Sequence, residues 1–309
     1  MISRSCALTF ALAAAAGAIT ASRAAGQERP QSAPPEEFAG CWRDAADSGR
    51  FLELEPGRMR DLSGAKLEFT RASYDVDTLT RHVWGRREVW ELSFEGERLV
   101  VQGGRVTRRF ERATERPAAL DPVPLVLGES TPLPAERRDA IAAEMAKRKE
   151  RDQAVRTDRH ELHAMEEVDA DNTRWLIERV QEVGWIDQGR FGKETALGAF
   201  LIVQHSGHLP LMLASLPEIE KDVKSNRLDP QNYALLFDRL RIRLGQRQRY
   251  GSQLGTDDAG RMVVLALEDR ERVEELRKEI GILPLRSYLA FFRNEHASGE
   301  VGFEDDEPD

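Results

Sequence analysis

The chain has 309 residues, of which 40% are hydrophobic and 32% are charged, and its formal net charge is −9. At roughly 150 residues per domain, this length predicts two domains with separate cores. The acidic balance argues against nucleic acid as a partner, because phosphate backbones require a basic footprint on the protein.

The first 24 residues have the pattern of a secretory signal peptide. An apolar run, 6-CALTFALAAAAGAI-19, is followed by the small residues 21-ASRA-24, which predicts cleavage after Ala24. A membrane-spanning helix needs roughly 20 apolar residues, and no run in the chain reaches that length. We therefore expect export to the periplasm or secretion, no stable transmembrane segment in the mature chain, and a disordered polar leader over 25–37.

Residues 38–112 alternate between apolar and polar positions with the period of β-strands. Turn-forming pairs such as 56-PG-57 and 95-EG-96 separate the alternating stretches, which predicts an antiparallel meander that curls into a small barrel or sandwich. The other faces are rich in Arg and Glu, so each strand should bury one side. The opening 38-FAGCWR-43 and the strand that ends at Phe110 resemble the small lipocalin-like barrels of exported bacterial proteins.

Five prolines between residues 113 and 134 predict an extended linker. From residue 135 to 293 the apolar positions recur every 3.6 residues, which predicts a mostly helical domain. An acidic tail follows over 294–309, with disorder expected at 304–309. The expected helices cover 135–160, 170–183, 193–208, 210–224, 230–249, 270–280 and 285–293, with a hairpin around 257-DDAG-260 inserted among them. The predicted fold class is therefore α+β, a small antiparallel β-barrel or sandwich followed by a mostly α-helical domain with an inserted β-hairpin.

Three of the expected helices place polar side chains on faces that should point into the core. Asp152 continues the apolar stripe of the first helix, and Gln248 continues the stripe of the helix over 230–249. The expected helix over 193–208 is apolar almost all round until Gln204 and His205 in its last part. Because a buried polar group needs a partner, these residues indicate either a site or a structural network.

Two histidine pairs, 160-HELH-163 and 205-HSGH-208, have the one-turn spacing at which two imidazoles can chelate a metal. The first pair lies in a charged segment typical of a solvated face, and Pro210 disturbs the helical position of the second. No Gly-x-Ser-x-Gly elbow, Walker loop or His-Glu-x-x-His motif is present. We therefore expect no metal site and no cofactor.

Spaced motifs run in order through the helical half: 151-RDQAVR-156, 171-DN-172, 184-GW-185, 191-FG-192, 204-QH-205, 238-DR-239, Gly245, 248-QRYGSQ-253, 268-ED-269 and Arg277. Over about residues 135–293 they resemble a bacterial family of uncharacterised proteins, domain-of-unknown-function family 6624. Its hallmark is a Gln-x-Tyr-Gly-Thr-Gln stretch, in which this chain has Ser252 in place of threonine. The resemblance implies a mostly helical domain with an accessory hairpin and a shared polar cluster, and it implies no particular reaction.

Three interpretations of the polar cluster remain open. In the first, the protein is an acid/base, hydrolase-like enzyme for a small polar substrate, in which His205 is the general acid or base and Asp152 or Asp238 orients it. In the second, the cluster binds a small polar ligand without catalysis, or the protein docks an envelope partner. In the third, the cluster is a purely structural network. The residues expected to contact a ligand are Gln153, Asn172, Gln204, Arg239, Gln248, Tyr250 and Gln253.

Overall fold

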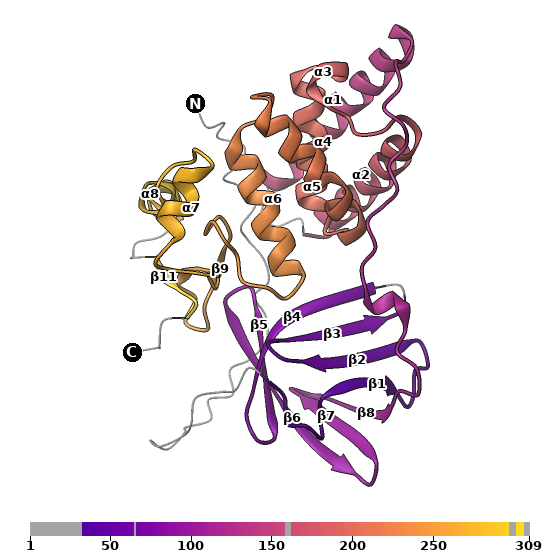
Figure 1. Ribbon diagram of the computed structural model, residues 1–309, viewed down its shortest axis with the longest axis vertical. Coiled ribbons are helices and arrows are strands. Elements are labelled where there is room, and N and C mark those ends of the chain that lie inside the picture. The colour runs from indigo at the N-terminus through magenta and orange to yellow at the C-terminus, as the bar shows by residue number, and fades with distance from the viewer. Residues whose placement is uncertain (1–32, 65, 158–161, 297–300, 306–309) are drawn as a thin grey trace.

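The computed structural model describes residues 33–64, 66–157, 162–296 and 301–305. A β-barrel forms one end of the molecule and a helical part forms the other (Figure 1). The expected signal peptide and most of the expected leader lie outside the described residues. Within those residues, no helix is both long and apolar enough to cross a membrane.

Eight antiparallel strands close into a barrel, because β1 pairs with both β2 and β8. Its interior is packed with apolar side chains such as Trp42, Leu54, Tyr74 and Leu99, each at most 2% exposed. The expectation of a barrel or sandwich is thus confirmed in the form of a closed barrel. The strands are β1 (Gly40–Asp44), β2 (Arg50–Glu55), β3 (Arg58–Ser63), β4 (Lys66–Tyr74), β5 (Thr78–Val83), β6 (Arg86–Glu95), β7 (Arg98–Gly103) and β8 (Val106–Arg112).

The sequence pattern did not separate β3 and β5 as strands. In β3 the reason is a buried charge, since Arg60 is only 6% exposed and interrupts the alternation of apolar and polar positions. The Arg60 guanidinium forms ion pairs with Glu53 at 3.0 Å and with Asp121 at 2.9 Å. Asp121 belongs to the Pro-rich segment, so Arg60 fastens that segment to the barrel.

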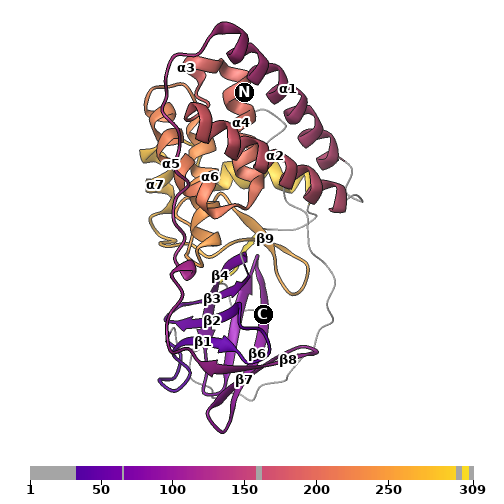
Figure 2. The same cartoon turned by 90° about the vertical axis from the view of Figure 1, so that its right-hand side faces the viewer.

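The Pro-rich segment between the two parts is bonded to both of them. It contains a short 3-10 helix, η2 (Ala118–Leu120), where a fully extended chain was expected. Farther along, the Leu125 amide donates to the Pro210 carbonyl and the Gly128 amide donates to the Val180 carbonyl, each at 2.9 Å. In both views the segment runs along the side of the helical part and reaches α1 at the end far from the barrel (Figures 1 and 2).

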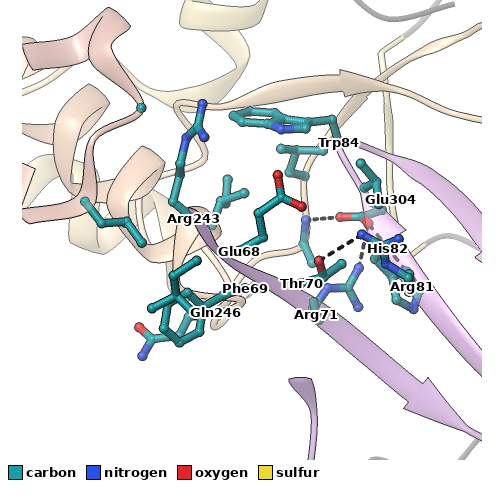
Figure 3. Close-up of a pocket in the computed structure, with 17 residues that line it drawn as sticks. Glu68, Phe69, Thr70, Arg71, Arg81, His82, Trp84, Arg243, Gln246 and Glu304 are labelled. Carbon is teal, nitrogen blue, oxygen red and sulfur yellow. Dashed lines mark hydrogen bonds and ion pairs between the residues drawn. The ribbon is translucent and has the colours of Figure 1, made fainter. Parts of the chain in front are cut away.

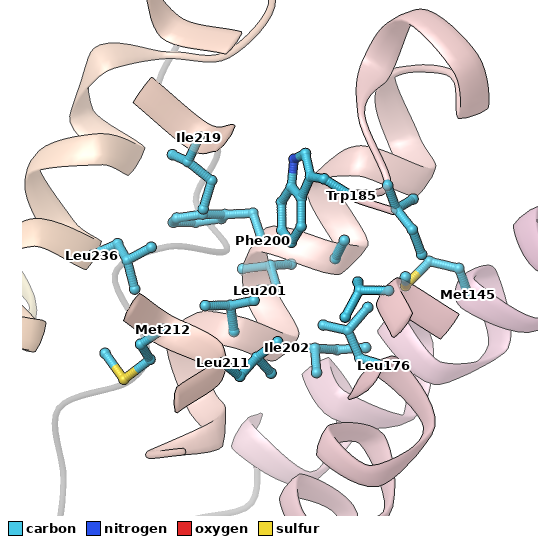
Figure 4. Close-up of a cluster of buried hydrophobic side chains, with 14 of the residues drawn as sticks. Met145, Leu176, Trp185, Phe200, Leu201, Ile202, Leu211, Met212, Ile219 and Leu236 are labelled. Carbon is cyan, nitrogen blue, oxygen red and sulfur yellow. The ribbon is translucent and has the colours of Figure 1, made fainter. Parts of the chain in front are cut away.

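The helical part is built around α4, whose side chains are buried almost all round. Phe200 and Ile202 of α4 pack with Leu211, Met212 and Leu236 in the largest apolar cluster among the described residues (Figure 4). This confirms the central helix expected from its apolar sequence. The helices are α1 (Ala135–Thr157), α2 (Leu162–Val183), α3 (Gln188–Phe191), α4 (Lys193–Ser206), α5 (Leu209–Lys224), α6 (Pro230–Arg243), α7 (Val273–Glu279) and α8 (Leu285–His296).

Two helix boundaries differ by more than one helical turn from those expected. Helix α2 begins at Leu162 instead of residue 170, and α6 ends at Arg243 instead of residue 249. The early end of α6 follows from Gly245, which adopts a left-handed backbone with φ of 68° that a helix cannot continue through. Residues 244–253 therefore form a loop that returns to α6.

The expected hairpin is present and joins the barrel to the helical part. Strand β9 (Leu254–Thr256) pairs antiparallel with β10 (Met262–Val264), and β11 (Gly302–Phe303) adds parallel to β10. The Thr256 amide donates to the Trp84 carbonyl of the barrel at 3.1 Å. The disorder expected from residue 304 is wrong for Glu304, which is buried against Arg71 of β4 at 2.6 Å. Residues 306–309 lie outside the described residues.

Candidate functional site

The residues that were expected to form one polar cluster fall into two groups of contacts. Asp152, Gln153, Asn172 and His205 lie where α1, α2 and α4 meet, whereas Asp238, Gln248, Tyr250 and Gln253 lie where α6 meets the loop and hairpin. Arg239 connects the groups, since its Nη1 donates to the Gln204 carbonyl at 2.8 Å and its Nε donates to Gln253 Oε1 at 3.1 Å.

Asp238 of α6 holds the loop that follows this helix. Its carboxylate is fully buried and accepts hydrogen bonds from the backbone amides of Arg249, Tyr250 and Ser252 at 2.8–3.0 Å, and from the Ser252 hydroxyl at 2.8 Å. Burial raises the pKa of Asp238, and the four donors act in the opposite direction. Gly251 makes the tight turn between these donors possible, with a left-handed φ of 66°.

The two buried amides of the loop are bonded to neighbouring protein groups. Gln248 Nε2 donates to the carbonyls of Gln253 and Leu265 at 2.9 and 2.7 Å, and Gln248 Oε1 accepts from the Gln253 amide at 2.8 Å. Gln253 Nε2 donates to the Leu235 carbonyl at 3.0 Å. Gln248 is thus buried as expected, but as part of the loop and not as a continuation of α6. We call Asp238, Gln248, Ser252 and Gln253 the loop brace, because their side chains bind one another and the backbone.

Tyr250 lies beside the loop brace and contributes its ring to a small aromatic group. Its ring centroid is 5.5 Å from that of Phe237 and 6.3 Å from that of Tyr233. The side chain is 6% exposed, and burial raises the pKa of its phenol. Tyr250 therefore packs as a core residue next to the turn.

His205 and Asp152 are in direct contact, which is one of the two pairings that the acid/base interpretation offered, while Asp238 binds the loop after α6 instead. His205 Nδ1 lies 3.0 Å from Asp152 Oδ1, and the two side chains are 3% and 1% exposed. Arg156 contacts Asp152 at 3.1 Å and Asp169 at 2.5 Å, while Gln153 Nε2 donates to Asp152 at 2.7 Å. We call Asp152, Arg156, Asp169 and His205 the ion cluster.

The protonation states in the ion cluster follow from its burial and its contacts. Burial lowers the pKa of His205 despite the neighbouring carboxylate, so the imidazole is neutral at pH 7. For Asp152, burial alone would raise the pKa, but the hydrogen bond from His205 and the charge of Arg156 hold it below its usual value. A neutral imidazole can donate only one proton, so the contact assigns that proton to Nδ1.

The ion cluster also contains a set of donor atoms that could approach a metal ion. Asp152, Asp169 and His205 each offer one atom, and these atoms all lie within 4.8 Å of one another. The Arg156 guanidinium, however, contacts both carboxylates and supplies the positive charge that a cation would supply. The donor set therefore fits an arginine-bridged ion pair better than a metal site.

The other histidines proposed for chelation have different surroundings. His208 Nδ1 accepts from the Leu211 amide at 3.2 Å and so caps α5. His163 is exposed and lies 3.3 Å from Glu167, and His160 lies outside the described residues.

Two of the expected ligand-binding amides, Asn172 and Gln204, are buried. Within the described chain, Asn172 Nδ2 and Gln204 Oε1 have no hydrogen-bond partner.

A cavity of about 170 Å³ lies between the barrel and the helical part (Figure 3). Strands β4 and β5 and the turn at Trp84 form its barrel side, while Gly207, the end of α6 and the segment after β10 form its helical side. None of its lining residues was among the expected site residues. Arg243 could have been found, because it stands one helical turn after Arg239, but the barrel residues gave no sequence signal.

Three arginines line this cavity, and they differ in their partners. Arg71 contacts Glu304 at 2.6 Å, and Arg81 contacts Glu88 at 3.2 Å. Arg243 has no carboxylate within 4.0 Å among the residues that the structure describes. Although its side chain is exposed to the cavity, protein surrounds it closely enough that desolvation lowers its pKa, and the charge of Glu68 opposes this effect only in part.

Glu304 forms one wall of the cavity and ties the chain end to the barrel. Its Oε1 lies 2.6 Å from Arg71 and 3.5 Å from His82 Nδ1, and its Oε2 accepts from the Ala266 amide at 2.7 Å. Burial alone would raise its pKa, but these contacts lower the pKa of Glu304 to about 2.

This shift predicts how stability depends on pH. A carboxyl whose pKa falls from 4.5 to about 2 on folding contributes roughly 3 kcal/mol, present above pH 4.5 and lost as the pH falls from 4.5 to 2. Glu304→Gln should therefore be less stable than the wild type at pH 7, with a difference that shrinks below pH 4.5. Urea unfolding at several pH values measures this, with the exposed Glu97→Gln as control. A difference independent of pH would contradict the assignment.

The sequence model of a family described as "Family of unknown function (DUF6624)" matches residues 139–299. No curated protein and no solved structure matches the chain. The matched region contains the loop brace, the ion cluster and most of the helical side of the cavity, and it excludes the barrel. The resemblance read from the spaced motifs is thereby confirmed.

Proposed function

We propose that this chain, which belongs to the family of unknown function DUF6624, is a binding protein that holds a small polar ligand in the cavity between its barrel and its helical part. The observation that carries the proposal is the lining of this cavity. It brings together the guanidinium of Arg243, the amide of Gln246, the hydroxyl of Thr70 and the indole of Trp84. A few convergent polar groups in a concave, partly apolar site are typical of ligand pockets.

The loop brace favours the cavity over the amide-rich loop as the binding site. The side-chain amides of Gln248 and Gln253 already bond to backbone carbonyls and amides, and both residues are 0% exposed. A ligand there would have to replace several satisfied hydrogen bonds, which costs free energy. Arg243, in contrast, presents its charge to the cavity.

Filling the cavity tests the proposal. Gln246 is exposed and lines the cavity, so Gln246→Trp should occupy the space without disturbing the core. Ligand-detected NMR with a mixture of neutral, cationic and anionic small polar compounds should show binding to the wild type and at least a tenfold loss in this variant. The exposed Lys224→Trp on α5 is the control and should bind as the wild type does. Equal binding by all three proteins, or none by any, would refute the proposal.

The contact between His205 and Asp152 supports a second candidate function, acid/base catalysis of the hydrolase type. A carboxylate on Nδ1 fixes the tautomer in which Nε2 can accept a proton, which a general base needs. A substrate would, however, have to reach an imidazole that is only 3% exposed. This candidate predicts that Asp152 contributes little to stability, whereas an ion cluster that holds α1, α2 and α4 together predicts a large contribution.

We also propose that the protein is exported. The support is the apolar run over 6–19 with small residues before a cleavage point at Ala24. Cleavage would remove Arg4 and Arg23 and change the formal charge from −9 to −11. The intact mass of the protein recovered from the cell envelope or medium tests this, and a mass that still includes residues 1–24 would contradict it.

A further inference from the structure

We infer that the ligand of the cavity is a small organic anion, with a carboxylate or phosphate group at Arg243 and a flat apolar part against Trp84. This inference rests on the proposed function and adds the chemical class of the ligand. Four features of the cavity support this inference: the partners of its arginines, the packing of the Arg243 guanidinium, the charge of the lining, and the position of the Trp84 indole.

The first feature is that Arg243 differs from the other lining arginines. Arg71 and Arg81 are each within 3.2 Å of a glutamate, so their charges are neutralised by the protein. For Arg243, no described carboxylate comes within ion-pair distance. Glu68 is the acidic residue that acts on it electrostatically, and the carboxylate of Glu68 instead contacts Lys66 at 2.7 Å. A partly desolvated guanidinium of this kind gains free energy when an anion binds.

The second feature is the contact between Arg243 and Gly207. A Cβ added to Gly207 would lie 3.1 Å from Cζ, Nη1 and Nη2 of Arg243, so the flat face of the guanidinium rests on this glycine. The residue has a left-handed φ of 59°, which also favours glycine. With one face covered, the N–H edges of Arg243 point along the plane, which is the geometry for bidentate binding of a carboxylate or phosphate.

The third feature is the charge of the lining. Arg71 pairs with Glu304, Arg81 pairs with Glu88, and Glu68 pairs with Lys66, so the charge of the lining that no described ion pair compensates is that of Arg243. The cavity thus carries excess positive charge in a chain whose formal net charge is −9. A local potential of this sign attracts anions and repels cations.

The fourth feature is Trp84, whose backbone has a φ of 50°, an outlier for a bulky residue. The hairpin holds this conformation in place, since the Thr256 amide donates to the Trp84 carbonyl and Gly255 packs against it. The indole lies above Glu68 (Figure 3), and Arg243 reaches the cavity from the opposite, helical side. A cavity of about 170 Å³ has room for one six-membered ring, which can stack on this indole.

Titration calorimetry with three probes tests the inference: benzoate, benzyl alcohol and inorganic phosphate. Benzoate should bind at least tenfold more tightly than neutral benzyl alcohol. Arg243→Gln should lower the affinity for benzoate and for phosphate at least tenfold, and Arg243→Lys should retain part of both affinities. Trp84→Ala should lower the affinity for benzoate more than the affinity for phosphate. Arg138→Gln, which removes an exposed charge on α1, is the matched control and should change none of these.

The outcomes separate this inference from the proposed function. Equal affinity for benzoate and benzyl alcohol, or unchanged benzoate binding by Arg243→Gln, would overturn the inference that the ligand is an anion. The proposed function would still stand if Gln246→Trp blocks the binding of either compound, because that result places a ligand in the cavity. Failure of both anions to bind at millimolar concentration would also overturn it. Thermal unfolding of each variant accompanies the titrations, and the expected result is an unfolding temperature close to that of the wild type for Arg243→Gln, because its side chain is exposed.

Discussion

Asp238→Ala is expected to lower the free energy of unfolding by about 3–5 kcal/mol, the largest effect of any single substitution in the loop brace. The carboxylate is 0% exposed and accepts hydrogen bonds from three backbone amides and one hydroxyl. Truncation would take this acceptor from the three amides, while the Ser252 hydroxyl keeps the Ala234 carbonyl at 3.1 Å, and each unsatisfied group costs about 1–3 kcal/mol. The loop over 244–253 should then detach from α6.

Urea unfolding of Asp238→Ala measures this loss directly. Asp229→Ala is a matched control, because Asp229 caps the start of the same helix through one hydrogen bond to Gln231 and should cost only about 1 kcal/mol. Asp238→Asn should fall between them, since its amide keeps one acceptor but turns a donor toward the backbone amides. A loss below 1 kcal/mol for Asp238→Ala would show that the loop does not depend on this carboxylate.

Asp152→Ala is the second substitution with a large expected effect, again about 3–5 kcal/mol. It would remove the partner of His205 and one of the two carboxylates that neutralise Arg156, a guanidinium whose side chain is 4% exposed. The buried Arg156 would then be paired with Asp169 alone, and this partly uncompensated charge would destabilise the packing of α1 against α2 and α4. Thermal and urea unfolding at pH 7 report the change.

The control for Asp152 lies close by on α2. Asp171 pairs with Arg148 and Arg151 but is 40% exposed, so Asp171→Ala should cost less than 1 kcal/mol. If Asp152→Ala were as stable as this control, the ion cluster would not hold the helices together. The acid/base interpretation of His205 and Asp152 would then become the stronger one.

The sequence predicted the types of structure because its periodicities are local. Alternation over 38–112 predicted an antiparallel barrel or sandwich, and the almost entirely apolar run before Gln204 and His205 predicted the central position of α4. Strand β3 was missed because Arg60 is buried by ion pairs with residues of β2 and of the Pro-rich segment. The local sequence pattern around Arg60 does not indicate these partners. The end of α6 was misplaced because the apolar stripe continued beyond the glycine that stops the helix.

In the candidate site, too, the features that depend on local sequence could be predicted, and those that depend on tertiary contacts could not. Helical spacing pointed Asp152 and His205 inward, so their contact was one of the two pairings considered, the other being that of His205 with Asp238. Gln248 was expected to be buried, but it is buried by the loop that folds back to Asp238. The cavity could not be foreseen, because it joins Trp84 and Glu68 of the barrel with Arg243 of α6 through tertiary packing alone. That Arg243 has no ion pair among the described residues becomes visible only when its neighbours in the fold are placed.

A crystal structure of the full chain grown with benzoate tests the central claim most directly, which is that the ligand lies between the barrel and the helical part and not at the amide-rich loop. The expected result is benzoate in the cavity, with its carboxylate at the N–H edge of Arg243 and its ring against Trp84. Benzoate bound beside His205 or within the 248–253 loop, with the cavity lining unaltered, would contradict it.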